Sequence, residues 1–363
     1  MLSLSERLRE RIQREGPISF CDWMKAALYD ETDGYYCRAG QRWGRAGDYR
    51  TSPERSVLFA ATIARYFAKL YRELDSPAEW FLVELGAGAG NFAEIVLATL
   101  QLRSPEVFAV TKYVIDERSA DSQTQARRRL ARFSNQVQFA RLETLGAVPA
   151  GVIFSNELPD AFAVHRVTFQ QGKLLEFFVD ATSAGTFEWR LLEPSTKRLE
   201  QYLSANDVQL SEGQIAEVNL EIEDWLEQVS GKLKRGYLVT VDYGAESPEL
   251  YSPAGRPYGT LRGFKQHQIV ADILSNPGEQ DITSSINWTH VMRTGEPLGL
   301  ETVDFARQDQ FLLREGLLEE LEQRVADSID ESERLALRTS AREMILPEGM
   351  ASSFQVLVQR KKP

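Results

Sequence analysis

The stretch VELGAGAGNF, residues 83–92, places Gly86, Gly88 and Gly90 at alternate positions directly after an apolar run. Glycine loses more backbone freedom on folding than any other residue, so this density of glycine needs a local reason. The apolar letters WFLVEL that lead into the glycines indicate a buried strand, and residues 91–103 indicate a helix. The glycines are therefore expected at a strand-to-helix junction, where a ligand can come close to the backbone.

The rest of the chain alternates short apolar runs with helical patterns. Strands are expected at residues 80–85, 112–117, 137–140, 151–158, 236–244, 298–306 and 352–360. Helices are expected at residues 3–14, 19–29, 53–74, 91–103, 119–132, 213–233, 266–274 and 308–343. Strands that alternate with helices indicate βαβ units and a mainly parallel sheet. The predicted fold class is therefore α/β with a Rossmann-like sheet.

Two parts of the chain are expected to lie outside this sheet. Residues 1–76 are predicted to form an N-terminal helical extension that ends in a long lid loop. Residues 77–363 are predicted to form the main domain, with an insertion at about 165–235. The insertion contains a predicted β ribbon at 165–193, which turns at a Gln-Gly pair and could mediate a homodimer.

Composition excludes several classes of protein. The net charge of -11 argues against general nucleic-acid binding, and no apolar run approaches the roughly 20 residues of a membrane helix. Two cysteines, Cys21 and Cys37, do not suggest a disulfide framework or a zinc site. The three histidines, His165, His267 and His290, are too scattered to predict a metal site. An acidic N-terminal segment without an apolar core leads us to expect a cytoplasmic protein.

Two cofactor classes compete for the glycine stretch, and a plain tight turn without a ligand is the third interpretation. A dinucleotide fingerprint needs G-x-G-x-x-G, but here Asn91 occupies the last position. The observed G-x-G-x-G, with Glu84 two residues before Gly86, resembles the first motif of class I S-adenosylmethionine (SAM)-dependent methyltransferases. In that interpretation the three glycines admit SAM. Asp116, at the end of the second strand, can accept both ribose hydroxyls, with Glu117 as the alternative.

Further stretches make the resemblance specific. The chain resembles the MidA-like family of SAM-dependent methyltransferases, which includes a mitochondrial protein arginine methyltransferase that assists respiratory complex I assembly. The resembling stretches are DGYY (33–36), GDYRTSPE (47–54), VELGAGAG (83–90), SNELPDAFAVHR (155–166), LVTVDYG (238–244), GTLRGFKQHQ (259–268) and PGEQDITSSINW (277–288). The resemblance implies N-methylation of an arginine side chain in a partner protein, such as a respiratory-complex subunit.

The first motif departs from the family pattern VELGPGRGT, because Ala87, Ala89 and Asn91 replace its Pro, Arg and Thr. The glycines are kept, so SAM binding is still expected. The substitutions leave open a SAM-binding assembly factor with little catalysis. The sequence is also compatible with a small-molecule methyl acceptor, and less so with an NAD-dependent oxidoreductase, which Asn91 disfavours.

The SNELPD segment supplies the predicted catalytic carboxylates. Glu157 and Asp160 could hold a guanidinium by charge-assisted hydrogen bonds, although Asp160 would also suit a helix cap. Asn156 could bind the cofactor or fix the loop. His267 could act as a base or bond a carboxylate, with a structural histidine as the alternative. Methyl transfer from SAM needs no metal, and none is predicted.

Two further segments could contribute to the site. Tyr35 and Tyr36 could flank a cationic substrate side chain, and a core role is expected for one of them. The polar residues from Asp48 to Glu54 could form a lid over the cofactor cleft, and Asp281 could cap or orient its loop.

Overall fold

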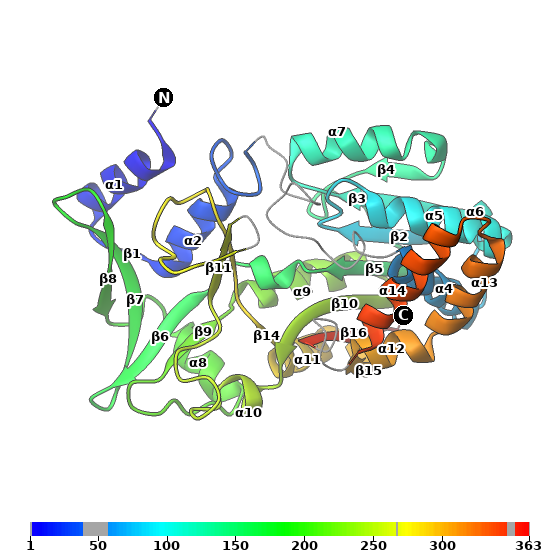
Figure 1. Ribbon diagram of the computed structural model, residues 1–363. Helices are drawn as coiled ribbons and strands as arrows, with labels where there is room; N and C mark the ends of the chain where they lie inside the picture. Colours follow the sequence, from blue (N-terminus) through cyan, green and yellow to red (C-terminus); the bar gives the residue numbers. More distant parts are fainter. Residues whose placement is uncertain (1, 39–56, 266–267, 347–352, 363) are drawn as a thin grey trace. The chain divides into compact units, whose positions relative to one another are not determined.

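The computed structural model describes residues 2–38, 57–265, 268–346 and 353–362 (Figure 1). The chain forms two compact units, and it passes between them several times. Unit 1 comprises Met1–Tyr49, Pro159–Trp225 and Gly244–Arg293, and unit 2 comprises Arg50–Leu158, Leu226–Tyr243 and Thr294–Pro363.

Unit 2 contains the predicted parallel sheet. Its strands are β2 (Trp80–Leu85), β3 (Thr111–Asp116), β4 (Val137–Phe139), β5 (Gly151–Asn156), β10 (Gly236–Ala245), β15 (Leu300–Arg307) and β16 (Phe354–Lys361). They are ordered β15-β16-β10-β5-β2-β3-β4, and only β16 runs antiparallel to its neighbours. The chain moves from β2 outward to β3 and β4, then returns to β5 on the other side of β2. Ligands of open α/β sheets bind at such a reversal of strand order.

Helices cover this sheet and bury its apolar residues. They are α4 (Val57–Glu73), α5 (Asn91–Arg103), α6 (Pro105–Val110), α7 (Ala120–Arg129), η1 (Ala131–Phe133), α9 (Glu221–Lys232), η3 (Glu296–Leu298), α12 (Gln308–Arg314), α13 (Leu317–Asp327) and α14 (Glu331–Ile345). Aromatic rings tie α4 and α5 to β5, since Phe92 stacks on Phe154 at 4.5 Å and Phe67 meets Phe154 edge-on. Such pairs stabilise the core by about 0.5–1.5 kcal/mol beyond their burial.

Unit 1 has a core and sheets of its own. A five-stranded antiparallel sheet contains β1 (Ile18–Ser19), β6 (His165–Gln170), β7 (Lys173–Ala181), β8 (Phe187–Leu192) and β9 (Ile215–Val218). A three-stranded sheet contains β11 (Arg262–Lys265), β12 (Gln268–Val270) and β13 (Asp281–Thr283), and β14 (Ile286–Asn287) pairs with the end of β10. The helices are α1 (Leu4–Glu15), α2 (Phe20–Tyr29), η2 (Pro159–Ala161), α8 (Arg198–Ala205), α10 (Ser247–Leu250) and α11 (Trp288–Gly295).

The sequence led us to expect a division between an N-terminal extension and the main domain at residue 76. The two units of the structure have different boundaries. Helix α4 packs in the core of unit 2, because nearly all its apolar side chains are buried against the sheet and α5. The ribbon of β6, β7 and β8 is part of the sheet of unit 1, where α1 and α2 pack against it. The N-terminal helices and the insertion therefore fold together.

Two expected helices are wrong. The segment 213–233 is helical only from Glu221, because residues Ile215–Val218 pair with β6 as strand β9. The segment 266–274 contains strand β12, which pairs antiparallel with β11. In both segments pairing with a neighbouring strand outweighs a helix-like spacing of apolar residues.

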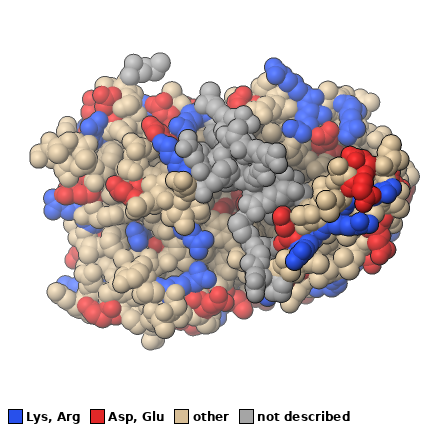
Figure 2. Space-filling model, in the orientation of Figure 1, with Lys and Arg blue, Asp and Glu red and all other residues tan. Residues whose placement is uncertain are grey.

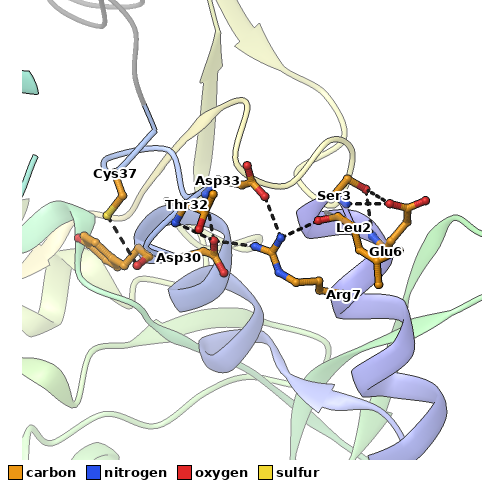
Figure 3. Close-up of polar contacts among 9 residues, drawn as sticks. Leu2, Ser3, Glu6, Arg7, Asp30, Thr32, Asp33 and Cys37 are labelled. Atoms are coloured by element: carbon orange, nitrogen blue, oxygen red, sulfur yellow. Dashed lines mark hydrogen bonds and ion pairs between the residues drawn. The ribbon is translucent and has the colours of Figure 1, made fainter. Parts of the chain in front are cut away.

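The first helix is fastened to the turn that follows α2 (Figure 3). Ser3 and Glu6 form a capping box that starts α1. The Arg7 guanidinium then donates to Asp30 at 2.7 Å and to Asp33 at 2.8 Å. One cation thus holds two of the carboxylates of the turn at the C-terminal end of α2.

Within the described ranges, no helix is both long and apolar enough to cross a bilayer. The same part of the chain contains no group of three or more His, Cys, Asp or Glu side chains placed to hold a metal ion.

Candidate active site

The carboxyl ends of β2, β3 and β5 lie level with one another. Leu85, the last residue of β2, is paired with Asp116 on β3 and with Ser155 on β5. The glycine loop follows β2, Glu117 follows β3, and Asn156 is the last residue of β5. They therefore meet at one edge of the unit 2 sheet, beside the reversal of strand order between β2 and β5.

The glycine loop folds back onto the end of β3. The amides of Gly86 and Ala87 donate to the carbonyl of Asp116, at 2.8 and 3.3 Å. Gly86 and Gly88 have φ of +68° and +54°, in the left-handed region that side chains other than glycine rarely adopt. A Cβ on Gly86 would also lie 3.1 Å from the Leu158 side chain. The backbone conformation therefore explains why glycine occupies positions 86 and 88.

Gly90 has a packing role at the start of α5. It caps α5 with φ +78°, and a Cβ there would lie 3.1 Å from the Cβ of Ala126 on α7. Arg129 of the same helix donates to the carbonyl of Ala89 at 3.1 Å. The third glycine thus lets α7 approach the loop, a packing role that the predicted cofactor contact did not include.

The last turn of α7 is basic. It carries three consecutive arginines, Arg127, Arg128 and Arg129, and Lys and Arg side chains gather over this helix in Figure 2. Cations near the carbonyl end of a helix are favourable to its dipole.

Glu117, rather than Asp116, lies against the glycine loop. Its Oε2 accepts from the Gly88 amide at 2.8 Å, and its Oε1 accepts from the Ser119 amide at 2.7 Å. Burial raises the pKa of Glu117, while these two amide hydrogen bonds oppose the rise. An ionised carboxylate has further lone pairs, so Glu117 could still accept from ribose hydroxyls.

The predicted ribose ligand, Asp116, is engaged elsewhere. Its carboxylate accepts from the Leu142 amide at 2.8 Å and pairs with Arg141 at 2.9 Å, both in the loop after β4. Burial raises the pKa of Asp116, and Arg141 counteracts the rise. The geometry therefore favours Glu117, the alternative left open by the sequence, as the acid nearest the loop.

Glu84 is buried within β2. The Tyr113 hydroxyl on β3 donates to its Oε2 at 2.7 Å. Burial raises the pKa of Glu84 to about 8, although the Tyr113 hydrogen bond opposes this. The side chain is consequently neutral in most molecules near neutral pH.

This proton makes folding stability depend on pH. The folded pKa lies above the ordinary value of 4.5, so the folded state holds a proton that the unfolded state releases. The contribution of protonated Glu84 to the free energy of unfolding is therefore complete below pH 4.5. It is lost as the pH rises toward 8. We expect Glu84→Gln to be more stable than the wild type by a few kcal/mol at high pH, and equal to it at low pH. Urea unfolding across this range measures the difference, and parallel curves for the two proteins would contradict it.

Glu157, the residue directly after Asn156 at the end of β5, has an unusual backbone conformation. Glu157 has φ +51°, a left-handed conformation that costs a residue other than glycine about 1–3 kcal/mol. Its amide donates to Val241 on β10 at 2.9 Å, and its Oε1 accepts from Asn156 Nδ2 at 3.1 Å. The buried Asn156 Oδ1 has no hydrogen-bond donor within the described residues. This acceptor could serve a ligand.

The next residues belong to unit 1. Asp160 is buried inside the short turn Pro159–Ala161, so it does not precede a helix as a cap would. Its carbonyl accepts from the Ser284 amide at 2.9 Å, and the Ala161 carbonyl accepts from the Tyr29 hydroxyl at 2.7 Å. These contacts fix the backbone that follows Glu157.

Some predicted site residues lie outside the described part of the chain, namely His267 and the lid segment from Asp48 to Glu54. Of the two tyrosines, Tyr35 is fully buried in the unit 1 core, which confirms the expected core role for one of them. Tyr36 stacks on Tyr29 and donates to Asp281 at 2.6 Å.

Sequence reasoning missed the support that α7 gives to the loop. Arg129 was not a candidate, because its helix shows only a run of arginines that suits an exposed surface.

Comparison with known proteins shows the family to which the chain belongs. Residues 62–306 match the model of a family described as "Putative S-adenosyl-L-methionine-dependent methyltransferase". The Drosophila melanogaster protein named "Protein arginine methyltransferase NDUFAF7 homolog, mitochondrial" is 27% identical over 98% of this chain and 84% of its own length. The human protein named "Protein arginine methyltransferase NDUFAF7, mitochondrial" is 23% identical over 96% of this chain and 81% of its length.

A solved structure gives the same result. A Burkholderia thailandensis protein bound to S-adenosyl-homocysteine superimposes with a TM-score of 0.86 at 26% identity, covering 99% of this chain and 92% of that one. The chain therefore belongs to this family and is a SAM-dependent methyltransferase.

Proposed function

We propose that this protein transfers a methyl group from SAM to a guanidinium nitrogen of an arginine side chain in a partner protein. The observation that carries the proposal is the left-handed Glu157 at the end of β5, beside the glycine loop. Strained non-glycine residues persist where the surrounding structure holds them, and they are concentrated at active sites and ligand-binding sites. The names of the mitochondrial relatives support arginine as the acceptor.

The residues at the sheet edge fit SAM. Glu117 offers carboxylate lone pairs beside the loop, and Gly86 and Gly88 keep the backbone free of side chains there. The open acceptor Asn156 Oδ1 suits a donor such as the ammonium of the methionine moiety. Glu84 and Asp116 would support the cofactor site indirectly. Glu84 would do so through its hydrogen bond with Tyr113, and Asp116 through its contact with the loop after β4. When bound, SAM supplies an electrophilic methyl group on a sulfonium.

Glu157 would hold the acceptor. A carboxylate binds a guanidinium through two parallel charge-assisted hydrogen bonds, which fixes its plane. The same contact concentrates positive charge on the bonded nitrogens and leaves the lone pair on the third nitrogen for attack. Orientation of this kind accounts for most of the rate enhancement that such a transfer needs. Asp160 and His267 remain proposed contributors, as a second carboxylate and as a base or hydrogen-bond partner.

The kind of partner protein follows from the proposed reaction. It carries an arginine on a segment that can reach Glu157, and the resemblance favours a respiratory-complex subunit. A scaffold with little catalysis needs no strained carboxylate at this edge, so the conformation of Glu157 favours an enzyme.

The test uses purified protein with methyl-labelled SAM and an extract of cells that lack the gene. We expect label in the protein fraction, and methylarginine after acid hydrolysis. Label in small molecules alone, or in another amino acid, would overturn the proposed acceptor. Binding of S-adenosyl-homocysteine measured on the same sample shows that the enzyme is intact.

A further inference from the structure

Strand β8 forms a free edge of the unit 1 sheet. It pairs with β7 along its whole length, from Phe187 to Leu192, and with no other strand in the described part of the chain. Leu191 and Leu192 at its end are 37% and 40% exposed. An open edge with apolar side chains favours addition of another strand.

The hairpin fixes which backbone groups point outward. The Thr182 amide donates to the Thr186 carbonyl at 2.8 Å, which makes this pair a hydrogen-bonded one. Hydrogen-bonded and non-bonded pairs alternate along an antiparallel ladder. The amides and carbonyls that face away from β7 are therefore those of Phe187, Trp189 and Leu191. These three residues can form a second ladder.

The charge pattern of β8 is self-complementary in one register. When two copies of a strand pair about a two-fold axis normal to the sheet, the axis must pass through a residue, because paired side chains share a face. An axis at Glu188 or Arg190 places two like charges opposite each other. An axis at Trp189 places Glu188 opposite Arg190 of the second copy, twice. Opposite charges in cross-strand pairs are favourable and like charges are unfavourable.

We propose that β8 pairs antiparallel with β8 of a second copy of this chain, with the two-fold axis at Trp189. The pairing joins two five-stranded sheets and places Phe187 opposite Leu191 of the second copy. Glu188 and Arg190 are 47% and 57% exposed, and Arg190 contacts Asp180 at 3.0 Å and Glu188 of its own chain at 3.6 Å, so all three groups form a surface cluster. Both charges thus remain accessible to the second copy.

The test compares two single charge reversals, Glu188→Arg and Arg190→Glu, by sedimentation over a concentration series. Each variant places like charges opposite each other at both contacts, so self-association should weaken about tenfold or more. An equimolar mixture restores two opposite-charge pairs and should form a heterodimer as readily as the wild type forms its dimer. Circular dichroism of each variant checks folding, which loss of exposed ion pairs should leave unchanged.

Each result bears on the proposal. A monomeric wild-type protein would overturn it and leave the edge to a segment of another protein. Variants that dimerise like the wild type would place the interface elsewhere. Monomeric variants that fail to associate when mixed would overturn the register at Trp189.

Discussion

Glu157→Gln is expected to lower kcat for methyl transfer by about 10²–10³-fold, with little change in the affinity for S-adenosyl-homocysteine. The substitution keeps the shape of the side chain and its bond from Asn156, but it removes the charge and one acceptor oxygen. A glutamine cannot form the paired hydrogen bonds that hold a guanidinium and direct its free nitrogen. Initial rates with labelled SAM measure the effect, and calorimetry measures cofactor affinity.

The matched control is Glu106→Gln, an exposed glutamate at the start of α6 that pairs with Arg72. It should leave both rate and affinity unchanged, because exposed ion pairs contribute little. A Glu157→Gln enzyme with a normal rate would exclude this carboxylate from acceptor binding. Loss of cofactor affinity alone would instead assign Glu157 to the SAM site.

Glu117→Gln is expected to weaken S-adenosyl-homocysteine binding by about 10–100-fold. The glutamine oxygen can still accept from the Gly88 amide, but its NH2 group cannot accept from Ser119, and one acceptor for ribose is lost. Asp116→Asn is the comparison, because that carboxylate contacts Leu142 and Arg141 instead of the loop. It should lower stability more than affinity. The opposite pattern, with affinity lost only in Asp116→Asn, would restore Asp116 as the ribose ligand.

The sequence predicted the central sheet well, because its signals are local. Strand β2 and helix α5 begin and end at the expected residues, where an apolar run meets a glycine turn. Prediction from the sequence failed where pairing with a strand distant in the sequence determines the local structure. Residues Ile215–Val218 become strand β9 only because β6 lies beside them, and α4 belongs to the sheet core because its whole apolar face is covered there.

The sequence indicated which segments meet at the candidate site, but it could not choose between neighbouring residues. Asp116 is the last residue of β3 and Glu117 is the first residue after it, so the motif alone cannot choose between these adjacent acids. The packing of Gly90 against Ala126 was likewise hidden, since it depends on how α7 returns to the loop. The left-handed conformation of Glu157 could not be predicted from the sequence, because glutamate rarely adopts it.

The most direct test of protein arginine methylation by this enzyme is quantitative mass spectrometry of methylarginine in cells. Three strains are compared: one that lacks the gene, one that carries the wild-type gene and one that carries Glu157→Gln at equal protein level. We expect at least one arginine-methylated peptide that is present with the wild type and absent from both other strains. Identical arginine methylation in all three strains, with a wild-type protein that binds S-adenosyl-homocysteine, would contradict it.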